Sequence, residues 1–118
     1  MKYLWLLLLS ISLNAKTLEV QPGDFDQTIV SGYVVVDFYA DWCGPCKQLS
    51  PIYEKLSDEM AEVVFAKYNV ETGVAPLHTY EIKSIPTMIV FKDGEEIARH
   101  VGCLELKKLR AFVKGSIE

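Results

Sequence analysis

The sequence predicts an α/β domain in which a mixed central sheet is flanked by helices on both faces. Apolar segments rich in β-branched residues alternate with segments whose apolar residues recur at helical spacing. This alternation implies parallel strands joined by helices, whereas a predicted hairpin near the end of the chain adds antiparallel ones. Because half of the 118 residues are apolar and no repeat or linker divides them, we expect one compact domain.

The first fifteen residues have the order of parts of a secretory signal peptide. A basic Lys2 is followed by an apolar run, residues 3–13, that only serines interrupt. Small Ala15 then stands directly before polar Lys16. The apolar run is shorter than the roughly 20 residues that a membrane-spanning helix needs.

We therefore expect residues 1–15 to be a signal peptide that is cleaved after Ala15. Residues 16–118 would then form the mature domain, in the periplasm or secreted. Two alternatives stay open. Leu13 is larger than the small residue usually preferred at this distance from the cut, so the segment could remain as a membrane tether. It could also be a hydrophobic first strand or a buried helix.

The first half of the domain contains two predicted strands and two helices. Residues 17–20 predict a short edge strand, followed by a helix with Asp24 as its N-cap. Residues 33–40 are almost continuously apolar, which indicates a central strand covered on both faces. The next helix contains Pro51, which should kink it. Its apolar residues recur at helical spacing: Leu49, Ile52, Tyr53, Leu56 and Met60.

The second half predicts a strand, a short helix, a hairpin and a final helix. Residues 63–70 form another buried strand, and a short helix begins near Pro76. Residues 86–102 predict a hairpin that turns at Asp93 and Gly94. An amphipathic helix closes the chain, with these residues available to pack: Leu104, Leu106, Leu109, Phe112 and Val113. The predicted order is therefore β-α-β-α-β-α-β-β-α.

Charge and cysteine content exclude several classes of protein. The formal net charge is −4 and no basic cluster is present, so nucleic acid is not an expected partner. Three cysteines in so apolar a chain do not make a disulfide-dense scaffold. The count is odd, so at least one thiol has no partner within the chain.

The pair Cys43 and Cys46 stands where the central strand ends and a helix begins. The first turn of a helix presents unpaired N–H groups and the positive end of the dipole, which stabilise a thiolate. The pKa of Cys43 should therefore lie below the free value of about 8.5. Gly44 permits close backbone approach, and Pro45 suits a first helical turn because no N–H is needed there.

This placement predicts exchange of electrons with other thiols. Cys43 would attack a substrate disulfide, and Cys46, one helical turn further on, would then attack Cys43 and release the reduced substrate. A purely structural disulfide is disfavoured, because so short a loop constrains the unfolded chain little. The alternative from another class is a zinc site built from Cys43, Cys46, His100 and Cys103.

Several motifs in order resemble the thioredoxin family over residues 17–115. The segment "WCGPC" is preceded by "VVVDFYAD" and followed by Lys47, and "SIPTMIVFKDGE" resembles the family's cis-proline strand and hairpin. Pro51, Lys67 and the "VG" before the last helix also match the family pattern. The resemblance implies a thioredoxin fold and a protein-disulfide reductase that needs no bound cofactor beyond its own dithiol.

The resemblance also implies a surface that binds substrate. Pro86 would be the cis-proline, which places the backbone of Ile85 where an extended substrate segment can pair with it. The residues around Cys43 would form a flat apolar docking surface: Trp42, Gly44, Pro45, Ile85, Val101 and Gly102.

Asp37 is an acid in the middle of an apolar strand, so burial should raise its pKa. From the residues alone, it could merely satisfy local hydrogen bonds. The resemblance places it behind Cys46, where it would help to move the proton of that thiol, with Lys67 nearby to tune it. His78 and His100 are expected at the surface. Cys103 is either a small buried residue or an exposed thiol at the rim of the docking surface.

The Gly-Pro dipeptide between the cysteines resembles reducing thioredoxins, near about −270 mV, rather than strong oxidants near about −120 mV. We therefore expect a monomeric reductant of disulfide-containing client proteins outside the cytosol. There it would need electrons from a membrane thiol protein. A specialised reductant of one client, such as the thiols of an apocytochrome c, remains an alternative.

Overall fold

The structure, a computed structural model, describes residues 16–118. The predicted signal peptide, residues 1–15, lies outside the described residues. Within the described part, a five-stranded sheet has the order β1-β3-β2-β4-β5. Its strands span Leu18–Glu19 (β1), Tyr33–Tyr39 (β2), Val64–Asn69 (β3), Thr87–Lys92 (β4) and Glu95–Val101 (β5).

The sheet is mixed, as the sequence predicts. Both β1 and β2 pair with β3 in parallel, while β4 runs antiparallel to β2 and β5 antiparallel to β4. Asp93 and Gly94 have positive φ angles of 50° and 89°, which suits the tight turn between β4 and β5. The backbone N–H of Asp93 also donates to the carbonyl of Gly32 at 3.0 Å, which ties this turn to the loop before β2.

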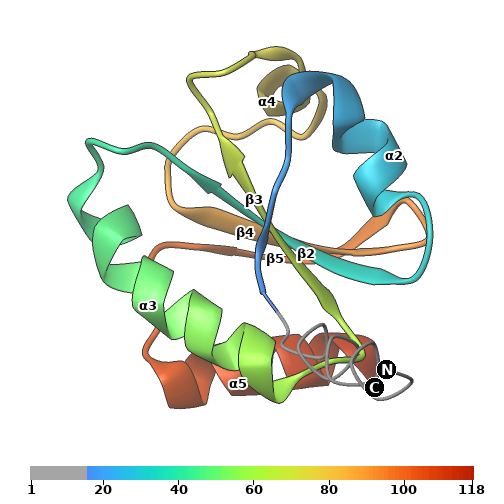
Figure 1. The fold of residues 1–118 in the computed structure, drawn as a ribbon, viewed down its shortest axis with the longest axis vertical. Helices are drawn as coiled ribbons and strands as arrows, with labels where there is room; N and C mark the ends of the chain where they lie inside the picture. Colours follow the sequence, from blue (N-terminus) through green and yellow to red (C-terminus); the bar gives the residue numbers. More distant parts are fainter. Residues whose placement is uncertain (1–15) are drawn as a thin grey trace, which may run out of the picture.

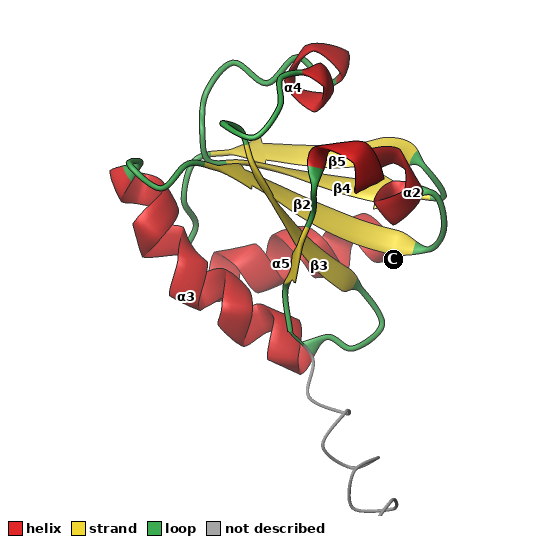
Figure 2. Cartoon of the chain, turned by 45° about the horizontal axis from the view of Figure 1, so that its top comes forward, coloured by secondary structure: helices red, strands yellow, loops and turns green. Residues whose placement is uncertain are grey.

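Helices cover both faces of the sheet (Figure 1). A short 3-10 helix, η1 (Pro22–Asp24), leads into α2 (Phe25–Ile29), which lies on the same face as α4 (Ala75–Thr79). The long helix α3 (Gly44–Glu59) and the final helix α5 (Leu106–Ile117) cover the other face. Figure 2 shows the sheet between these two helical layers. None of the helices between residues 16 and 118 is long and apolar enough to cross a bilayer.

The predicted element order is confirmed, with boundaries shifted by a few residues. Asp24 occupies the N-cap position of α2, but its side chain makes no capping hydrogen bond. Helix α3 includes Pro51 in its interior. The kink expected at this proline stays a prediction.

The residues of β2 face the two helical layers alternately. Successive side chains of a strand point to opposite faces. Val34, Val36 and Phe38 pack toward α2, whereas Val35 packs against α3 and α5. Asp37 is two residues beyond Val35 and therefore faces the α3 and α5 layer. The strand that carries the site thus directs one acid toward the helix that carries the cysteines.

Candidate redox-active site

Cys43 and Cys46 are joined by a disulfide at the start of α3, with their Cα atoms 5.2 Å apart. Cys43 is the N-cap of the helix, and the backbone N–H of Cys46 donates to its Sγ at 3.2 Å. When the disulfide is reduced, the same N–H and the positive end of the helix dipole favour a thiolate at Cys43. The strand-to-helix junction predicted for the pair is confirmed.

Both sulfur-bearing residues are nearly covered in the oxidised state. Cys43 is 5% exposed and Cys46 4% exposed, and they pack with Ala40, Val70 and Ile85. The Sγ of Cys43 lies 3.9 Å from the carbonyl oxygen of Ile85. Ile85 is therefore brought against Cys43, although 42 residues separate them in the sequence.

The peptide bond between Ile85 and Pro86 is cis, as the family resemblance implies. The backbone N–H of Gly102 donates to the carbonyl of Pro86 at 2.8 Å, and Val101 pairs with Thr87 across β5 and β4. These contacts bring the Val101–Gly102 pair beside the proline. Gly102 has a φ of 103°, a conformation that glycine adopts readily.

The docking surface contains both exposed and covered residues. Trp42 is 67% exposed and Val101 55% exposed, so both present apolar area to solvent. Gly44 and Pro45 are exposed, Ile85 and Gly102 are half-buried, and Pro86 is buried. Within this set, Ile85 contacts Cys43, and Val101 and Gly102 contact the segment that contains the cis-proline. Binding of substrate to this surface stays a prediction.

Asp37 is buried in β2 and is 1% exposed. Neither of its carboxylate oxygens receives a hydrogen bond from any residue between 16 and 118. Loss of solvation raises its pKa to about 7, an effect that the charge of Lys67 opposes and that of Glu19 reinforces. The expected burial and raised pKa are confirmed, whereas a role in proton transfer stays a prediction.

Lys67 stands opposite Asp37 in the register of β3 and β2. Its ammonium donates to the hydroxyl of Ser50 at 3.1 Å and lies 4.7 Å from the centre of the Tyr39 ring. The hydroxyl of Tyr39 in turn donates to the carboxylate of Glu19 at 2.8 Å. Burial, reinforced by this hydrogen bond, raises the pKa of Tyr39.

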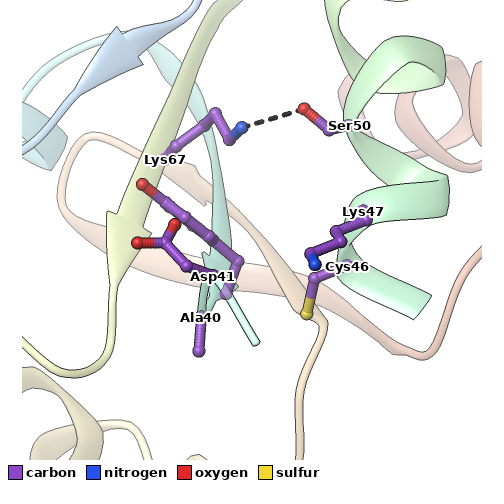
Figure 3. A pocket seen from close by; sticks show the side chains of 7 residues that line it. Ala40, Asp41, Cys46, Lys47, Ser50 and Lys67 are labelled. Carbon is purple, nitrogen blue, oxygen red and sulfur yellow. Dashed lines mark hydrogen bonds between the residues drawn. The ribbon is translucent and has the colours of Figure 1, made fainter. Parts of the chain in front are cut away.

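A recess of about 320 Å³ opens between the end of β2 and the start of α3. Its wall includes Tyr39 of β2, Lys67 of β3, and Cys46, Lys47 and Ser50 of α3. Figure 3 shows Cys46 and Ser50 on the helix and Lys67 reaching toward Ser50 from the sheet. Cys46 thus forms part of the wall of this recess, together with Lys47 and Ser50 of the same helix.

Sequence reasoning did not single out Ser50, Tyr39 or Glu19. Signals for two of them were present in the sequence. Ser50 follows Cys46 by four residues, which places both on one face of a helix, and Tyr39 follows Asp37 by two, which places both on one face of a strand. The position of Glu19 beside Lys67 depends on the pairing of β1 with β3, which spacing along the chain does not reveal.

The zinc alternative is not supported by the geometry. Among residues 16–118, no group of three or more His, Cys, Asp or Glu side chains lies close enough to hold a metal ion. Cys43, Cys46, His100 and Cys103 are therefore not gathered into one site. His78 is exposed as expected, but His100 is half-buried because its ring packs on Phe112, with the ring centres 5.9 Å apart.

Cys103 is half-buried and packs against the core between the sheet and α5. Its Sγ lies 3.8 Å from the carbonyl oxygen of Leu104. Burial and the nearby charge of Asp37 raise the pKa of its thiol, which lowers its reactivity at neutral pH. These properties favour the interpretation of Cys103 as a packing residue over that of a reactive thiol at the rim.

Comparison with known proteins agrees with this geometry. The thioredoxin family model matches residues 16–115. A thioredoxin of Chlamydia pneumoniae is 53% identical over 83 residues, which cover 70% of this chain and 81% of that protein. A thioredoxin of Chlamydia muridarum is 45% identical over 95 residues, which cover 80% of this chain and 90% of that protein.

Solved structures show the same fold. The crystal structure of a Malassezia sympodialis thioredoxin superposes with a TM-score of 0.78 at 32% identity, covering 88% of this chain and 93% of that one. A mutant thioredoxin from Halobacterium salinarum superposes with a TM-score of 0.79 at 33% identity, covering 87% of this chain and 92% of that one.

The fold and the Cys43–Cys46 pair define a thiol–disulfide oxidoreductase that acts as a protein-disulfide reductase. The chain belongs to the thioredoxin family. Its sheet, its helices and its cysteine pair at the start of α3 agree with that assignment.

Proposed function

We propose that this reductase works outside the cytosol, with Cys43 as the attacking thiol and Cys46 as the resolving thiol. The observation that carries the assignment of roles is the N–H of Cys46 directed at the Sγ of Cys43 at 3.2 Å. An N–H donor at a helix start stabilises the thiolate it points to, so Cys43 is the sulfur prepared to attack.

The reaction moves two electrons from the dithiol to the client. The Cys43 thiolate attacks one sulfur of the client disulfide, whose S–S bond breaks, and the other client sulfur leaves as a thiolate and takes up a proton. Cys46 then loses its proton and attacks the Sγ of Cys43. The mixed disulfide breaks, the second client thiol is released, and the Cys43–Cys46 disulfide remains.

The client approaches over the docking surface. Trp42 and Val101 are exposed there and supply apolar contact area, while Ile85 brings its carbonyl close to the Sγ of Cys43. An extended client segment would pair with the backbone of Ile85 and place its disulfide at Cys43, as the family resemblance implies. The clients are disulfide-containing proteins, and a single dedicated client remains the second candidate.

Trapping of the mixed disulfide tests the assignment of roles. Cys46→Ser should accumulate a disulfide between Cys43 and a model client, because the resolving thiol is missing. Cys43→Ser should trap none and should lose all reductase activity. Equal trapping through Cys46 in the Cys43→Ser variant would reverse the two roles.

Export is supported by the residue order of the first fifteen positions, a basic start, an apolar run and a small residue before Lys16. Outside the cytosol the monomeric domain would receive its electrons from a thiol pair of a membrane protein. Intact-mass measurement of the protein from its native host tests the export step. The mass should correspond to a chain that begins at Lys16. A soluble cytosolic protein that retains Met1 would refute export and leave the reductase assignment in place.

A further inference from the structure

Arg99 of β5 joins the edge of the sheet to the end of α4. Its side chain donates two hydrogen bonds to the carboxylate of Glu96, from Nε at 2.6 Å and from Nη2 at 2.7 Å. The same Nη2 donates to the backbone carbonyl of Tyr80 at 2.8 Å. One guanidinium therefore binds a carboxylate of its own strand and the backbone of a residue that lies 19 positions earlier in the chain.

A β-bulge places Glu96 and Arg99 on the same face of the sheet. Side chains three residues apart on a regular strand point to opposite faces. Here Ala98 pairs with Val90, but Glu96 pairs with Phe91, so β5 contains one extra residue between these two pairs. The bulge thus brings the carboxylate of Glu96 to the face on which the guanidinium of Arg99 meets the end of α4.

Helix α4 ends in a conformation that is unfavourable for Glu81. Tyr80 is the C-cap of the helix, and the N–H of Glu81 donates to the carbonyl of His78 at 3.3 Å. The N–H of Ile82 donates to the carbonyl of Leu77 at 2.9 Å, and these two hydrogen bonds together define a Schellman motif. The motif needs a residue with positive φ, usually glycine, and Glu81 takes this place with a φ of 51°. Contacts from outside the helix therefore matter for holding its end.

Arg99 supplies such a contact. The last carbonyls of a helix have no partner within it, and the N–H groups of a basic side chain can bind them. The hydrogen bond with Glu96 raises the pKa of Arg99, burial opposes this rise, and the charges of Glu96 and Glu81 add to it. Glu96 fixes the direction of the guanidinium, because both of its oxygens accept from the planar fork of donors.

The segment that begins at Tyr80 leads to the residue that faces Cys43. Ile85 follows five positions later, and its carbonyl oxygen lies 3.9 Å from the Sγ of Cys43. Near the other end of this segment, the hydroxyl of Thr87 donates to the carbonyl of Ser84 at 2.6 Å. Residues 80–85 are thus attached to β5 at their first residue and to β4 near their last.

We propose that Arg99 and Glu96 are positioning residues that hold residues 80–85 in place, so that the backbone of Ile85 is ready to pair with an extended client. This inference rests on the proposed function, in which the client pairs with Ile85. Binding to a mobile backbone carries the entropy cost of ordering that backbone, whereas a segment already held in place avoids this cost. Arg99 and Glu96 should therefore raise the affinity for protein clients and leave the chemistry at Cys43 unchanged.

Amide hydrogen exchange in the oxidised protein tests the positioning without any client. In Arg99→Gln the amides of Glu81 and Ile82 should exchange about fivefold faster, because the end of α4 opens more often. Arg99→Lys keeps the charge but not the fork of donors, so it should give an intermediate rate. Arg110→Gln is the matched control: Arg110 also donates two hydrogen bonds to one carboxylate, that of Glu59, but this pair joins α5 to α3.

The two ion pairs are similarly exposed. The side chains of Arg99 and Glu96 are 30% and 31% exposed, and those of Arg110 and Glu59 are 31% and 36% exposed. Loss of either pair should therefore have a similar general effect on stability. Unchanged exchange at residues 81 and 82 in Arg99→Gln, or equally fast exchange there in Arg110→Gln, would overturn the proposal.

Single-turnover reduction of insulin, used as a model client protein, tests the effect on binding. Arg99→Gln should raise the half-saturating insulin concentration about fivefold, equivalent to about 1 kcal/mol, and leave the limiting rate near the wild-type value. Reduction of bis(hydroxyethyl) disulfide, which has no extended segment, should change little. Glu96→Gln should have a smaller effect than Arg99→Gln, and no further effect when it is added to that variant.

The control variant and the small disulfide decide the outcome. Arg110→Gln should leave the half-saturating insulin concentration unchanged. An equal rise in this control, an unchanged value in Arg99→Gln, or an equal loss of activity toward the small disulfide would overturn the proposal. Absence of insulin reduction by the wild type would instead count against the proposed function, and hydrogen exchange would still decide whether Arg99 holds the segment.

Discussion

Asp37 and Lys67 stand opposite each other across β2 and β3, yet the ammonium of Lys67 donates to Ser50 and leaves the carboxylate of Asp37 without a hydrogen bond from residues 16–118. A buried acid without such a partner is costly to ionise, since the low-polarity interior does not replace its lost solvation. Its pKa consequently rises from 3.8 to about 7. The burial that raises the pKa of Asp37 into the neutral range also lowers the stability of the fold at neutral pH.

The first prediction concerns stability. The folded protein binds the proton of Asp37 more tightly than the unfolded chain, so this contribution to stability is complete below about pH 4 and is lost as pH rises through about 7. Asp37→Asn should remove this slope and should stabilise the oxidised protein at neutral pH. A shift from 3.8 to about 7 corresponds to a gain on the order of 4 kcal/mol.

Denaturant unfolding at a series of pH values measures this effect. The free energy of unfolding of the wild type should fall relative to that of Asp37→Asn between about pH 4 and about pH 7. Parallel curves for the two proteins would show that Asp37 has the same pKa in the folded and unfolded states, which would contradict the account of its burial.

The second prediction concerns the docking surface. Val101→Asp places a charge on an exposed apolar residue beside the cis-proline segment. It should raise the KM for a client protein about tenfold or more, since one buried side chain contributes roughly 1.5–3 kcal/mol. Reduction of a small soluble disulfide should change little, because it needs no extended surface.

Ile97→Asp serves as the matched control for this change. Ile97 is 44% exposed on the same strand, β5, but it lies near the turn and not beside Pro86. Its substitution should leave the KM for the client protein near the wild-type value. Equal effects of the two substitutions would show that loss of β5 structure, and not loss of a docking contact, explains the result.

The third prediction concerns Cys103. Because its thiol is half-buried and has a raised pKa, it should react slowly with an alkylating reagent in the folded protein and quickly after denaturation. Cys103→Ala should retain wild-type reductase activity and lose about 1 kcal/mol or less of stability. Rapid labelling in the folded state, or a disulfide between Cys103 residues of two chains after oxidation, would favour the rim interpretation.

The sequence predicted the layers of this fold because its apolar patterns are long and regular. The run at residues 33–40 and the periodic positions of the last helix leave little choice of structure. The place of Cys43 followed from the end of one such run. The burial of Asp37 was predicted in the same way, since every side chain of a central strand that is covered on both faces is buried.

The remaining parts of the site depend on contacts between distant segments. The contact of Ile85 with Cys43 and the hydrogen bond from Gly102 to Pro86 join loops that local patterns cannot pair. These residues were predicted from the family resemblance and not from local patterns in the sequence. Ser50 was missed because a serine within a helix gives no signal of its own, and its hydrogen bond with Lys67 depends on how β3 packs against α3.

The reduction potential of the Cys43–Cys46 pair is the most direct test of the central claim that this chain is a reductase. Equilibration of the Cys103→Ala variant in thiol buffers of known potential, followed by alkylation and mass measurement, reports this pair alone. The account predicts a potential near about −270 mV, as for reducing members of the family. A value near about −120 mV, typical of strong oxidants, would contradict it.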